Sequence, residues 1–396
     1  MPGTDVKLLA SGFLLALFSS VGQTFFIALF GGQIRAEFGL THGTFGSLYS
    51  LATLVSGFAM LWMGAALDRI SLQAYSVTAS AMLALSCVLL ASTQSATLLV
   101  MAIFGLRLAG QGMMSHASVT GMARAFTRHR GKAIAFATMG HPVGEALLPS
   151  IVVTAVALLG WREVWIAAAV LITVAIAVVF CLLRQAGLQT ATEQPGDNSG
   201  SESYTRGEVI RSLRFYLIVP TLVGASFTMT GLLFHQVHLT EVKGWTLAWF
   251  ASCFTAYAVA STVSLIAFGS LIDRLTAVRL MPFYLLPLCL ACLLLAFGSH
   301  QLVALAFMGL AGVTMGAGKP VLTAMWAEVY GVGHLGAVRA LAASLIVIAS
   351  ALAPATMGWL IDLDVSMESI ALSCAAYLIC ANLLLVTAFH APAFRR

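Results

Sequence analysis

Two basic residues lie inside long apolar stretches, where a charge can serve to bind an anion. Arg107 falls within the apolar stretch 96–122, and Lys319 falls within the stretch 302–327. A charged side chain in a membrane interior is costly and usually faces a cavity or a partner. A guanidinium offers a planar fork of donors to a carboxylate, and an ammonium acts as a point charge. We therefore expect Arg107 and Lys319 to bind a small organic or inorganic anion, most simply a carboxylate.

A histidine and a carboxylic acid share one face of a third apolar stretch, 132–158. His141 and Glu145 are four residues apart, which is one helical turn. Burial favours the protonated form of a carboxyl group and an ion pair favours the charged form, so a carboxyl that exchanges a basic partner for a proton couples proton movement to substrate. We expect Glu145 and His141 to carry the proton, and His141 also to contact substrate. Neutralisation of Glu145 by Arg107 is the second interpretation, and both can hold.

Two amides and two further histidines complete the candidate substrate and gate residues. Gln111 lies one turn after Arg107, and Gln23 lies in the first apolar stretch, so both are expected to bind substrate by hydrogen bonds. His235 and His238 lie near the outer end of the seventh apolar stretch. They are candidates for a periplasmic gate, with exposed, hydrogen-bonded histidines as the alternative.

The elements that must position these residues are membrane helices. The chain of 396 residues is 60% hydrophobic and 9% charged, with a mean hydropathy of +0.96, whereas soluble domains carry about 25% charged residues. About 20 apolar residues span the hydrocarbon as a helix, and the runs here are continuous instead of alternating as in a β-barrel. The sequence therefore predicts an all-α membrane protein with twelve transmembrane helices. The stretches are 9–33, 45–67, 74–93, 96–122, 132–158, 162–183, 213–238, 246–271, 279–298, 302–327, 336–361 and 369–390.

The chain repeats itself at an offset of 205 residues, which predicts two six-helix bundles related by pseudo-symmetry. In membrane transporters such repeats enclose the transport path. Lys319 maps onto Met114, which shares a helix face with Arg107 and Gln111, so the repeat points Arg107 and Lys319 into one central cavity. The matches include Gly39, Thr41, Asp68, Arg69, Gly131 and Pro149, which recur as Gly244, Thr246, Asp273, Arg274, Gly336 and Pro354.

The basic residues fix the expected orientation. With both termini in the cytoplasm, fifteen of the twenty Lys and Arg residues fall on that side and three on the other, in agreement with the positive-inside rule. The polar segment 185–210 is then a flexible cytoplasmic linker between the bundles 1–184 and 211–396. We expect a multi-pass protein in the lipid of a bacterial-type inner membrane. The net charge of +5 reflects this topology and indicates no nucleic-acid partner.

A short motif with a carboxylate follows the second apolar stretch of each half. Gly-Ala-Ala-Leu-Asp-Arg at 64–69 ends in Asp68 and Arg69, and its copy at 269–274 ends in Asp273 and Arg274. An aspartate at the cytoplasmic end of a helix can pair with basic side chains and with the N-terminal amides of a neighbouring helix. The basic residues available to Asp68 in the next cytoplasmic loop are Arg128, Arg130 and Lys132.

These motifs, with Arg-Leu-Ala-Gly-Gln-Gly at 107–112 and the glycine and proline pattern of 140–149, resemble the signatures of the major facilitator superfamily over essentially the whole chain. The resemblance implies a transporter, not an enzyme, that works by alternating access as a monomer without a cofactor. It also implies a cytoplasmic gate that holds one conformation and opens in the other. The gate residues would be Asp68, Arg69, Arg130, Asp273 and Arg274.

The sequence departs from the family pattern in two places. Residues 70–73, Ile-Ser-Leu-Gln, replace the usual glycine and basic residues. The fifth apolar stretch lacks the proline and double glycine of drug/proton antiporters, which argues against drug export but leaves it an alternative.

Soft ligands support another alternative, a copper or transition-metal importer, because thioether and imidazole suit copper. The candidate ligands are Met113, Met114, His116, Met139, His141, Met229, His235 and His238. No resident metal is expected, since Cys289 and Cys292 form a lone C-x-x-C inside an apolar helix. A receptor that keeps the transporter fold would have lost the cavity charges, and these are present. Without a Gly-x-x-x-x-Gly-Lys-Ser/Thr motif, an ion or substrate gradient should supply the energy.

Overall fold

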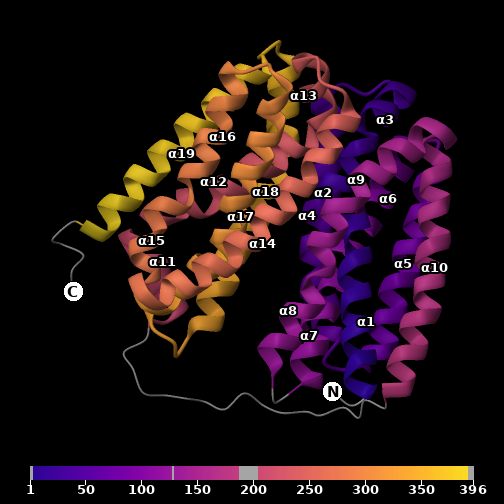
Figure 1. The fold of residues 1–396 in the computed structure, drawn as a ribbon, viewed down its shortest axis with the longest axis horizontal. Coiled ribbons are helices and arrows are strands. Elements are labelled where there is room, and N and C mark those ends of the chain that lie inside the picture. The colour runs from indigo at the N-terminus through magenta and orange to yellow at the C-terminus, as the bar shows by residue number, and fades with distance from the viewer. Residues whose placement is uncertain (1–2, 127–128, 187–203, 391–396) are drawn as a thin grey trace. The chain divides into compact units, whose positions relative to one another are not determined.

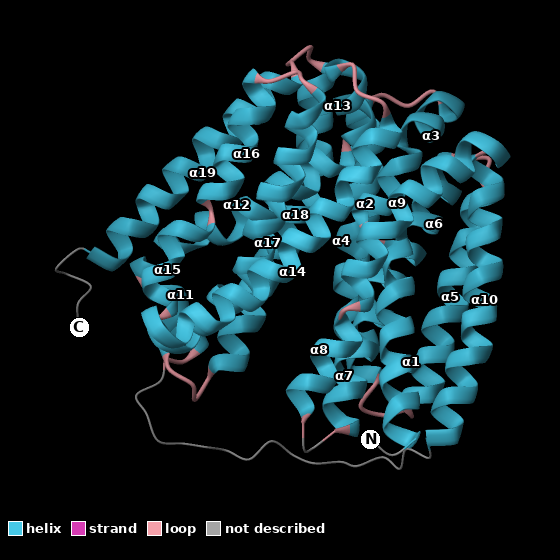
Figure 2. Ribbon diagram, viewed as in Figure 1, coloured by secondary structure: helices cyan, strands magenta, loops and turns pink. Residues whose placement is uncertain are grey.

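Helices joined by loops make up the described part of the computed structural model, residues 3–126, 129–186 and 204–390, and no strand occurs in it (Figure 1, Figure 2). Twelve spans in this part are long and apolar enough to cross a membrane, which confirms the predicted number and fold class. The chain divides into two compact units, Met1–Glu193 and Gln194–Arg396. Each unit contains six of the spans.

The helices of the first unit are α1 (Gly3–Ser19), η1 (Ser20–Gly22), α2 (Thr24–Ile27), η2 (Ala28–Phe30), α3 (Gly31–Phe38), α4 (His42–Ala66), α5 (Leu72–Ala91), α6 (Ala96–Leu106), η3 (Arg107–Met114), α7 (Ser115–Ala125), α8 (Arg130–Thr138), α9 (Gly140–Leu159) and α10 (Trp161–Ala186). Those of the second unit are α11 (Arg206–Arg211), α12 (Leu213–Phe234), α13 (Gln236–Lys243), α14 (Leu247–Leu275), α15 (Ala277–Tyr284), α16 (Leu286–Phe297), α17 (Gln301–Tyr330), α18 (Leu335–Asp362) and α19 (Met367–His390). Several spans are therefore assembled from two or more consecutive helices.

The sequence repeat reproduces local geometry as well as residue type. Gly39 ends α3 with a φ of 61°, and Gly244 ends α13 with a φ of 66°. Both lie in the left-handed region, which glycine adopts without strain. Two residues later Thr41 caps α4 by accepting from the Thr44 amide, and Thr246 caps α14 by accepting from the Trp249 amide. The same turn thus joins the first and second spans in each unit.

The first span is broken, although its sequence predicts one continuous helix over 9–33. Gln23 has an extended backbone, with φ −85° and ψ 155°, between η1 and α2. The equivalent span of the second unit shows no such break, because α12 runs unbroken through the corresponding residues to Phe234. The fourth span has a related irregularity, since η3 is a π-helical segment between α6 and α7. Such segments are frequent at functional sites.

An ion pair joins the start of the last span to the end of the first span in each unit. In the first unit Arg162 pairs with Glu37, which also accepts from Trp161 Nε1 at 2.9 Å. In the second unit Lys243 Nζ lies 2.8 Å from Glu368 Oε1. The sign of the charge on each helix is opposite in the two units, so the repeat preserves the ion pair and not the residue types.

The segment predicted as a flexible linker, 185–210, lies mostly outside the described residues. Its described end is helical, which corrects the expectation for that part. Thr205 and Glu208 form a capping box at the start of α11, and the Tyr204 amide donates to the Tyr330 carbonyl at 3.0 Å. A capping box satisfies two helix N-terminal donors, which explains why this short polar segment is ordered.

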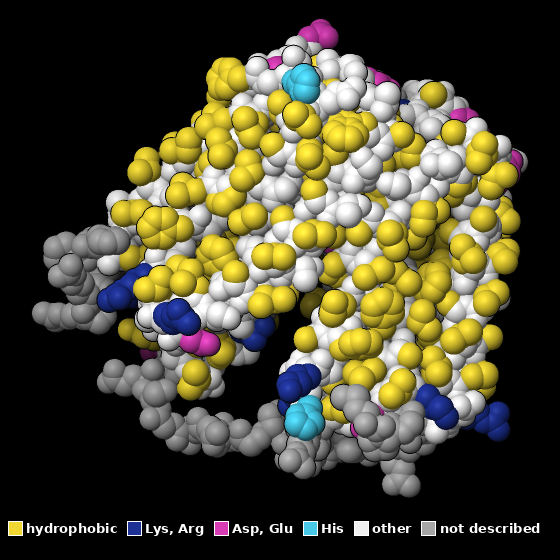
Figure 3. Space-filling model, viewed as in Figure 1, with side chains coloured by type: hydrophobic (Ala, Val, Ile, Leu, Met, Phe, Trp, Pro, Cys, Tyr) yellow, Lys and Arg dark blue, Asp and Glu magenta, His cyan; other side chains and the backbone are white. Residues whose placement is uncertain are grey.

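Hydrophobic side chains cover the sides of both units on the face shown in Figure 3. Most of the Lys and Arg side chains visible there gather at one end of each unit. That end carries α7 and α8 in the first unit, and α11 and α15 in the second. This distribution is the one expected of spans with their basic loops on one side of a membrane.

Candidate functional site

Arg107 is buried at the junction between α6 and η3, with 3% of its surface exposed. Its Nη1 donates to the Gly22 carbonyl at 3.2 Å and to Thr24 Oγ1 at 3.3 Å. The guanidinium also lies over the ring of Tyr49, 5.4 Å from the ring centre, in a cation–π contact. Arg107 therefore binds the two ends of the break in the first span.

The backbones of the first and fourth spans lie very close together at Gly22, which brings its carbonyl within reach of Arg107. A methyl group at Gly22 would lie 2.8 Å from Gly110 Cα and 2.9 Å from Gln111 N. These distances are shorter than any ordinary carbon contact, so only glycine permits the two spans to lie this near each other. The break leaves the Gly22 carbonyl available, and the charged donor of Arg107 stabilises it where water is excluded.

The second interpretation of Arg107, an ion pair with Glu145 in at least one conformation, is not realised in this conformation. Among the described residues Arg107 has no carboxylate within ion-pair distance, and its Nε makes no hydrogen bond. Glu145 Oε2 instead lies 3.4 Å from His141 Nδ1. The partners that Arg107 does have belong to the broken span, which the sequence analysis had treated as unbroken.

His141 and Glu145 form a half-buried dyad on α9. The His141 ring meets Phe25 of α2 edge-on, with ring centres 6.4 Å apart. The α9 backbone lies against α1, since a methyl group at Gly140 or Gly144 would lie under 3.0 Å from atoms of α1 and η1. The predicted pairing of the two residues on one helix face is thus present, and close packing holds their helix against the broken span.

The two predicted amides belong to the same region of the first unit. Gln23 is the extended residue at the break, and Gln111 lies in η3 one turn after Arg107. Both side chains are half-buried. Gln23, Gln111 and the His141–Glu145 dyad are therefore polar groups associated with the broken span.

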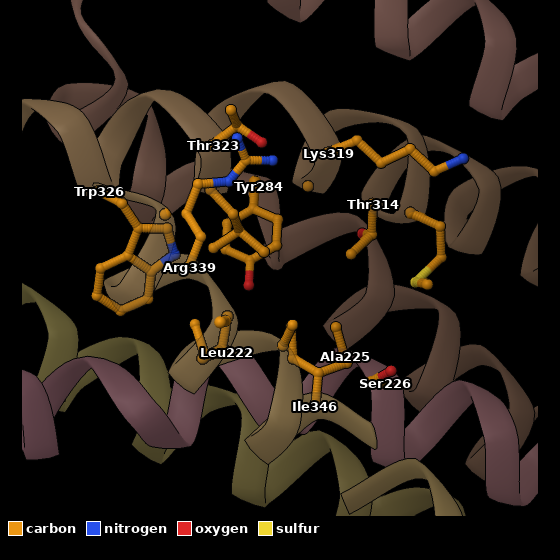
Figure 4. A pocket seen from close by; sticks show the side chains of 17 residues that line it. Leu222, Ala225, Ser226, Tyr284, Thr314, Lys319, Thr323, Trp326, Arg339 and Ile346 are labelled. Carbon is orange, nitrogen blue, oxygen red and sulfur yellow. The ribbon is translucent and has the colours of Figure 1, made fainter. Parts of the chain in front are cut away.

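Lys319 lies in the second unit and lines a cavity of about 580 Å³. Figure 4 shows this cavity from close by, with Lys319 and Thr314 from α17, Arg339 and Ile346 from α18, Tyr284 from α15 and Leu222 from α12. The lining contains two cations, Lys319 and Arg339, both on exposed residues, and no Asp or Glu. The cavity is therefore electropositive.

Several polar groups of this cavity already have partners in the protein. The Tyr284 hydroxyl donates to the Thr221 carbonyl at 3.0 Å. The Leu288 amide donates to Thr314 Oγ1 at 3.0 Å. The first bond ties α15 to α12, and the second ties α16 to α17. The cationic groups are thus the strongest features that the lining offers to a ligand.

Arg339 is a cavity-lining residue that is not among the predicted site residues. It is one of the fifteen basic residues that the predicted topology assigns to the cytoplasmic side, because it lies near the start of a span. In the structure it is the fifth residue of α18, one turn after Gly336, and both line the cavity. A basic residue inside the first turns of a predicted span was the available signal.

The cytoplasmic motif of the first unit pairs differently from the prediction. Asp68 forms its ion pair with Arg124, whose Nη1 also donates to the Leu67 carbonyl at 2.8 Å. Arg130 Nε instead donates to the Ala123 carbonyl at 2.6 Å. Of the other predicted partners, Lys132 is exposed on α8 and Arg128 lies outside the described residues. The ion pair thus links the segment that follows α4 to the end of α7.

The copy of this motif has another arrangement. Asp273 and Arg274 are exposed at the end of α14, and within the described chain neither of these two residues forms an ion pair. Arg69, which follows α4 in the first unit, is exposed as well. A different carboxylate, Glu328 of α17, accepts from the Ala277 and Val278 amides at 2.8 and 3.0 Å and so stabilises the start of α15. Duplication of the motif therefore did not duplicate its contacts.

The two histidines near the end of α12 differ from the surface residues of the alternative interpretation. His235 is 4% exposed and its Nε2 lies 3.0 Å from the Pro354 carbonyl of α18. His238 Nδ1 lies 3.9 Å from Glu241 on the next turn of α13. His235 thus holds the junction between α12 and α13 against α18.

No group of three or more His, Cys, Asp and Glu side chains that could hold a metal ion occurs among residues 3–126, 129–186 and 204–390. Met114, one of the candidate soft ligands, is buried in η3 with 2% of its surface exposed.

Comparison with known proteins identifies the family from the sequence and finds solved structures with a similar fold. The family model described as Major Facilitator Superfamily matches residues 12–255 and 216–396. No curated protein sequence matches the chain.

Three solved structures, of two transporters, share the fold over nearly the whole chain. A bacterial homologue of the human lysosomal transporter Spinster, inward-facing and unoccupied, is 14% identical with a TM-score of 0.75, covering 98% of this chain and 97% of that chain. The same homologue in its occupied inward-facing state is 14% identical with a TM-score of 0.70 over the same shares. The nucleoside transporter NupG is 12% identical with a TM-score of 0.77, covering 98% and 99%.

Proposed function

The chain belongs to the Major Facilitator Superfamily, and we propose that it transports a small organic or inorganic anion, most simply a carboxylate, across an inner membrane by alternating access and with proton coupling. It is a multi-pass membrane transporter with twelve spans. The finer proposal concerns the charge of the substrate, the source of energy and the residues that act on each.

The observation that carries the anion proposal is the cavity of the second unit. Lys319 and Arg339 both line it, and the lining has no acidic side chain. A cavity that presents cations and no counter-charge attracts an anion, because the charges of one sign that line it add to one local potential. A neutral substrate gains nothing from this potential, and a cationic substrate is repelled by it.

Proton coupling is assigned to the first unit. Glu145 and His141 are half-buried with Oε2 and Nδ1 3.4 Å apart, so a proton taken up by one side chain can pass to the other, which then releases it. Gln23 and Gln111 add hydrogen-bonding groups to the same unit. Arg107 is assigned a positioning role, since its Nη1 donates to both sides of the break in the first span.

The gate proposals follow from position. The cytoplasmic gate of the first unit is assigned to the ion pair between Asp68 and Arg124. Arg69, next to Asp68 in the chain, and Arg130, six residues after Arg124, are assigned to the same gate. Asp273 and Arg274 provide exposed charges at the equivalent place of the second unit, and His235 and His238 belong to the periplasmic end of α12 and α13. This assignment has both termini in the cytoplasm and the protein active as a monomer.

Matched ligands test the charge of the substrate. Binding of benzoate and of its neutral isostere benzamide is measured on purified protein in nanodiscs, for the wild type, Lys319→Gln, Arg339→Gln and the control Arg279→Gln, an exposed cation outside the cavity. A charge-assisted contact contributes about 1.5–3 kcal/mol, so each cavity substitution should weaken benzoate binding about ten- to a hundredfold. Arg279→Gln should leave it unchanged.

Other outcomes would favour the alternatives. Benzamide bound as tightly as benzoate would overturn the anion proposal. Cu(I) bound tightly and lost in Met114→Leu and His141→Ala would favour a copper importer, and a lipophilic cation bound in place of benzoate would favour a drug antiporter.

Proton coupling has a separate test in proteoliposomes. Glu145→Gln should abolish accumulation driven by a pH gradient and retain exchange of substrate at equal pH, because exchange needs no net proton transfer. Unchanged accumulation in this variant would remove Glu145 from the mechanism.

A further inference from the structure

The cavity of the second unit also carries information about the body of the substrate. We propose that this cavity selects monocarboxylates with an apolar, aryl or alkyl body over inorganic anions and hydroxylated acids, and that Arg339 anchors the carboxylate. This inference rests on the proposed function. Both parts follow from the lining residues and from the start of α18.

The first step is the size of the cavity. Its volume is about 580 Å³, whereas one water molecule occupies about 30 Å³ of liquid. An inorganic anion would fill a small part of this space and leave the rest to water. A ligand of ten or more heavy atoms can use the volume, which lies within the range of ordinary ligand pockets.

The second step is the chemistry of the walls. Leu222, Ala225, Leu322 and Ile346 contribute aliphatic surface from α12, α17 and α18. Of the four hydroxyl groups in the lining, those of Tyr284 and Thr314 already bond to the protein, and those of Ser226 and Thr323 complete the set. A hydroxylated acid would lose its hydration against walls that are mostly aliphatic, whereas an apolar body gains from leaving water.

The third step is an aromatic wall that other rings hold in place. Trp326 is 2% exposed and lines the cavity. Its ring stacks on Tyr330, with centres 5.8 Å apart and planes 26° apart, and it meets Phe215 at 6.2 Å. Trp326 therefore offers the ligand a small apolar surface, and because its neighbours fix the ring, that surface loses little conformational entropy on binding.

The fourth step distinguishes the two cations. Gly336 is the second residue of α18 and lines the cavity together with Arg339, one turn further on. The N-terminus of this helix carries partial positive charge, so it adds to the guanidinium at the same place. Figure 4 shows the Arg339 guanidinium among Thr323, Trp326 and Tyr284, while Lys319 extends toward the Thr314 side. Arg339 is therefore the better carboxylate anchor.

The ligand series that tests the body of the substrate is phosphate, lactate, acetate, benzoate and 3-phenylpropionate, with 3-phenylpropionamide as the neutral partner. Affinities are measured by competition in nanodiscs, with empty nanodiscs as reference. Each buried methylene contributes about fourfold in affinity, so 3-phenylpropionate should bind more than a hundredfold tighter than acetate. Phosphate and lactate should bind no tighter than acetate.

A cavity-filling variant separates the body from the charge. Ala343 is exposed in the lining, so Ala343→Phe takes up cavity space without disturbing a packed core. It should weaken 3-phenylpropionate at least tenfold and change acetate less than twofold. Ala337→Phe, on an exposed residue of the same helix outside the lining, is the matched control and should change neither.

The anchor is tested by the cation variants with the same ligand. Arg339→Gln should weaken 3-phenylpropionate about ten- to a hundredfold, and Lys319→Gln should weaken it less. A larger loss in Lys319→Gln would overturn the anchor assignment.

The results distinguish this inference from the proposed function. Phosphate or lactate binding as tightly as 3-phenylpropionate, or equal losses for acetate and 3-phenylpropionate in Ala343→Phe, would overturn the apolar selection and leave anion transport intact. The neutral amide binding as tightly as the acid would overturn the anion proposal itself.

Discussion

The close contact between the first and fourth spans can be tested by adding one methyl group. In Gly22→Ala the new methyl would lie 2.8 Å from Gly110 Cα and 2.9 Å from Gln111 N. These are backbone atoms, so no flexible side chain can move aside, and the spans must separate by several tenths of an ångström. Overpacking of this kind costs about 1–3 kcal/mol. At about 2–4 °C per kcal/mol for a unit of this size, the unfolding midpoint should fall by roughly 2–12 °C.

Separation of the spans should also lengthen the hydrogen bond from Arg107 to the Gly22 carbonyl, now 3.2 Å. Arg107→Met removes the same bond by another route. If both variants act through one contact, the double variant should lose less stability than the sum of the single losses.

The assay is thermal unfolding in detergent, followed by tryptophan fluorescence, with Gly131→Ala as control. A methyl group at Gly131 meets nothing within 4 Å, and alanine is favoured over glycine in a helix by up to about 1 kcal/mol. The control should therefore unfold at the same or a higher temperature than the wild type. Equal midpoints for Gly22→Ala and Gly131→Ala would refute the close approach of the two spans, and additive losses in the double variant would refute the shared contact.

Three further predictions concern charge. Asp68→Asn and Arg124→Gln should each slow transport more than they weaken substrate binding, with a stability coupling below about 1 kcal/mol because the side chains are 67% and 40% exposed; unchanged transport in both would make the motif a simple turn. The hydrogen bond from Arg162 lowers the pKa of Glu37 below its ordinary 4.5. The contribution of Glu37 to stability is therefore present above that pH and is lost as pH falls through the lowered pKa. Between pH 5 and pH 3 the wild type should lose more stability than Glu37→Gln, and equal losses in the two proteins would contradict this. In a cysteine-free background, a Cys at Thr41 should react with an impermeant reagent from outside and one at His334 should not; the reverse pattern would invert the topology.

The sequence alone determined the fold class because membrane helices are specified locally. Their length follows from the thickness of the hydrocarbon, and their backbone must bond within each helix, so the apolar stretches define them. The repeat added a second local signal, and the structure shows its effect in the equivalent left-handed residues Gly39 and Gly244 and the equivalent caps Thr41 and Thr246. The pairing of His141 with Glu145 was predictable for the same reason, since both lie on one helix face.

Only the tertiary structure decided which distant groups meet. The break at Gln23 is held by Arg107, a residue of another span, so no periodicity within 9–33 reveals it. Asp68 pairs with Arg124 and not with the cations that follow it in the loop, because the pairing depends on how α4 and α7 end side by side. Arg339 and Lys319 share a cavity because α17 and α18 both contribute to its walls. Spacing along a chain fixes which residues share a helix face, whereas the packing of helices decides what that face meets.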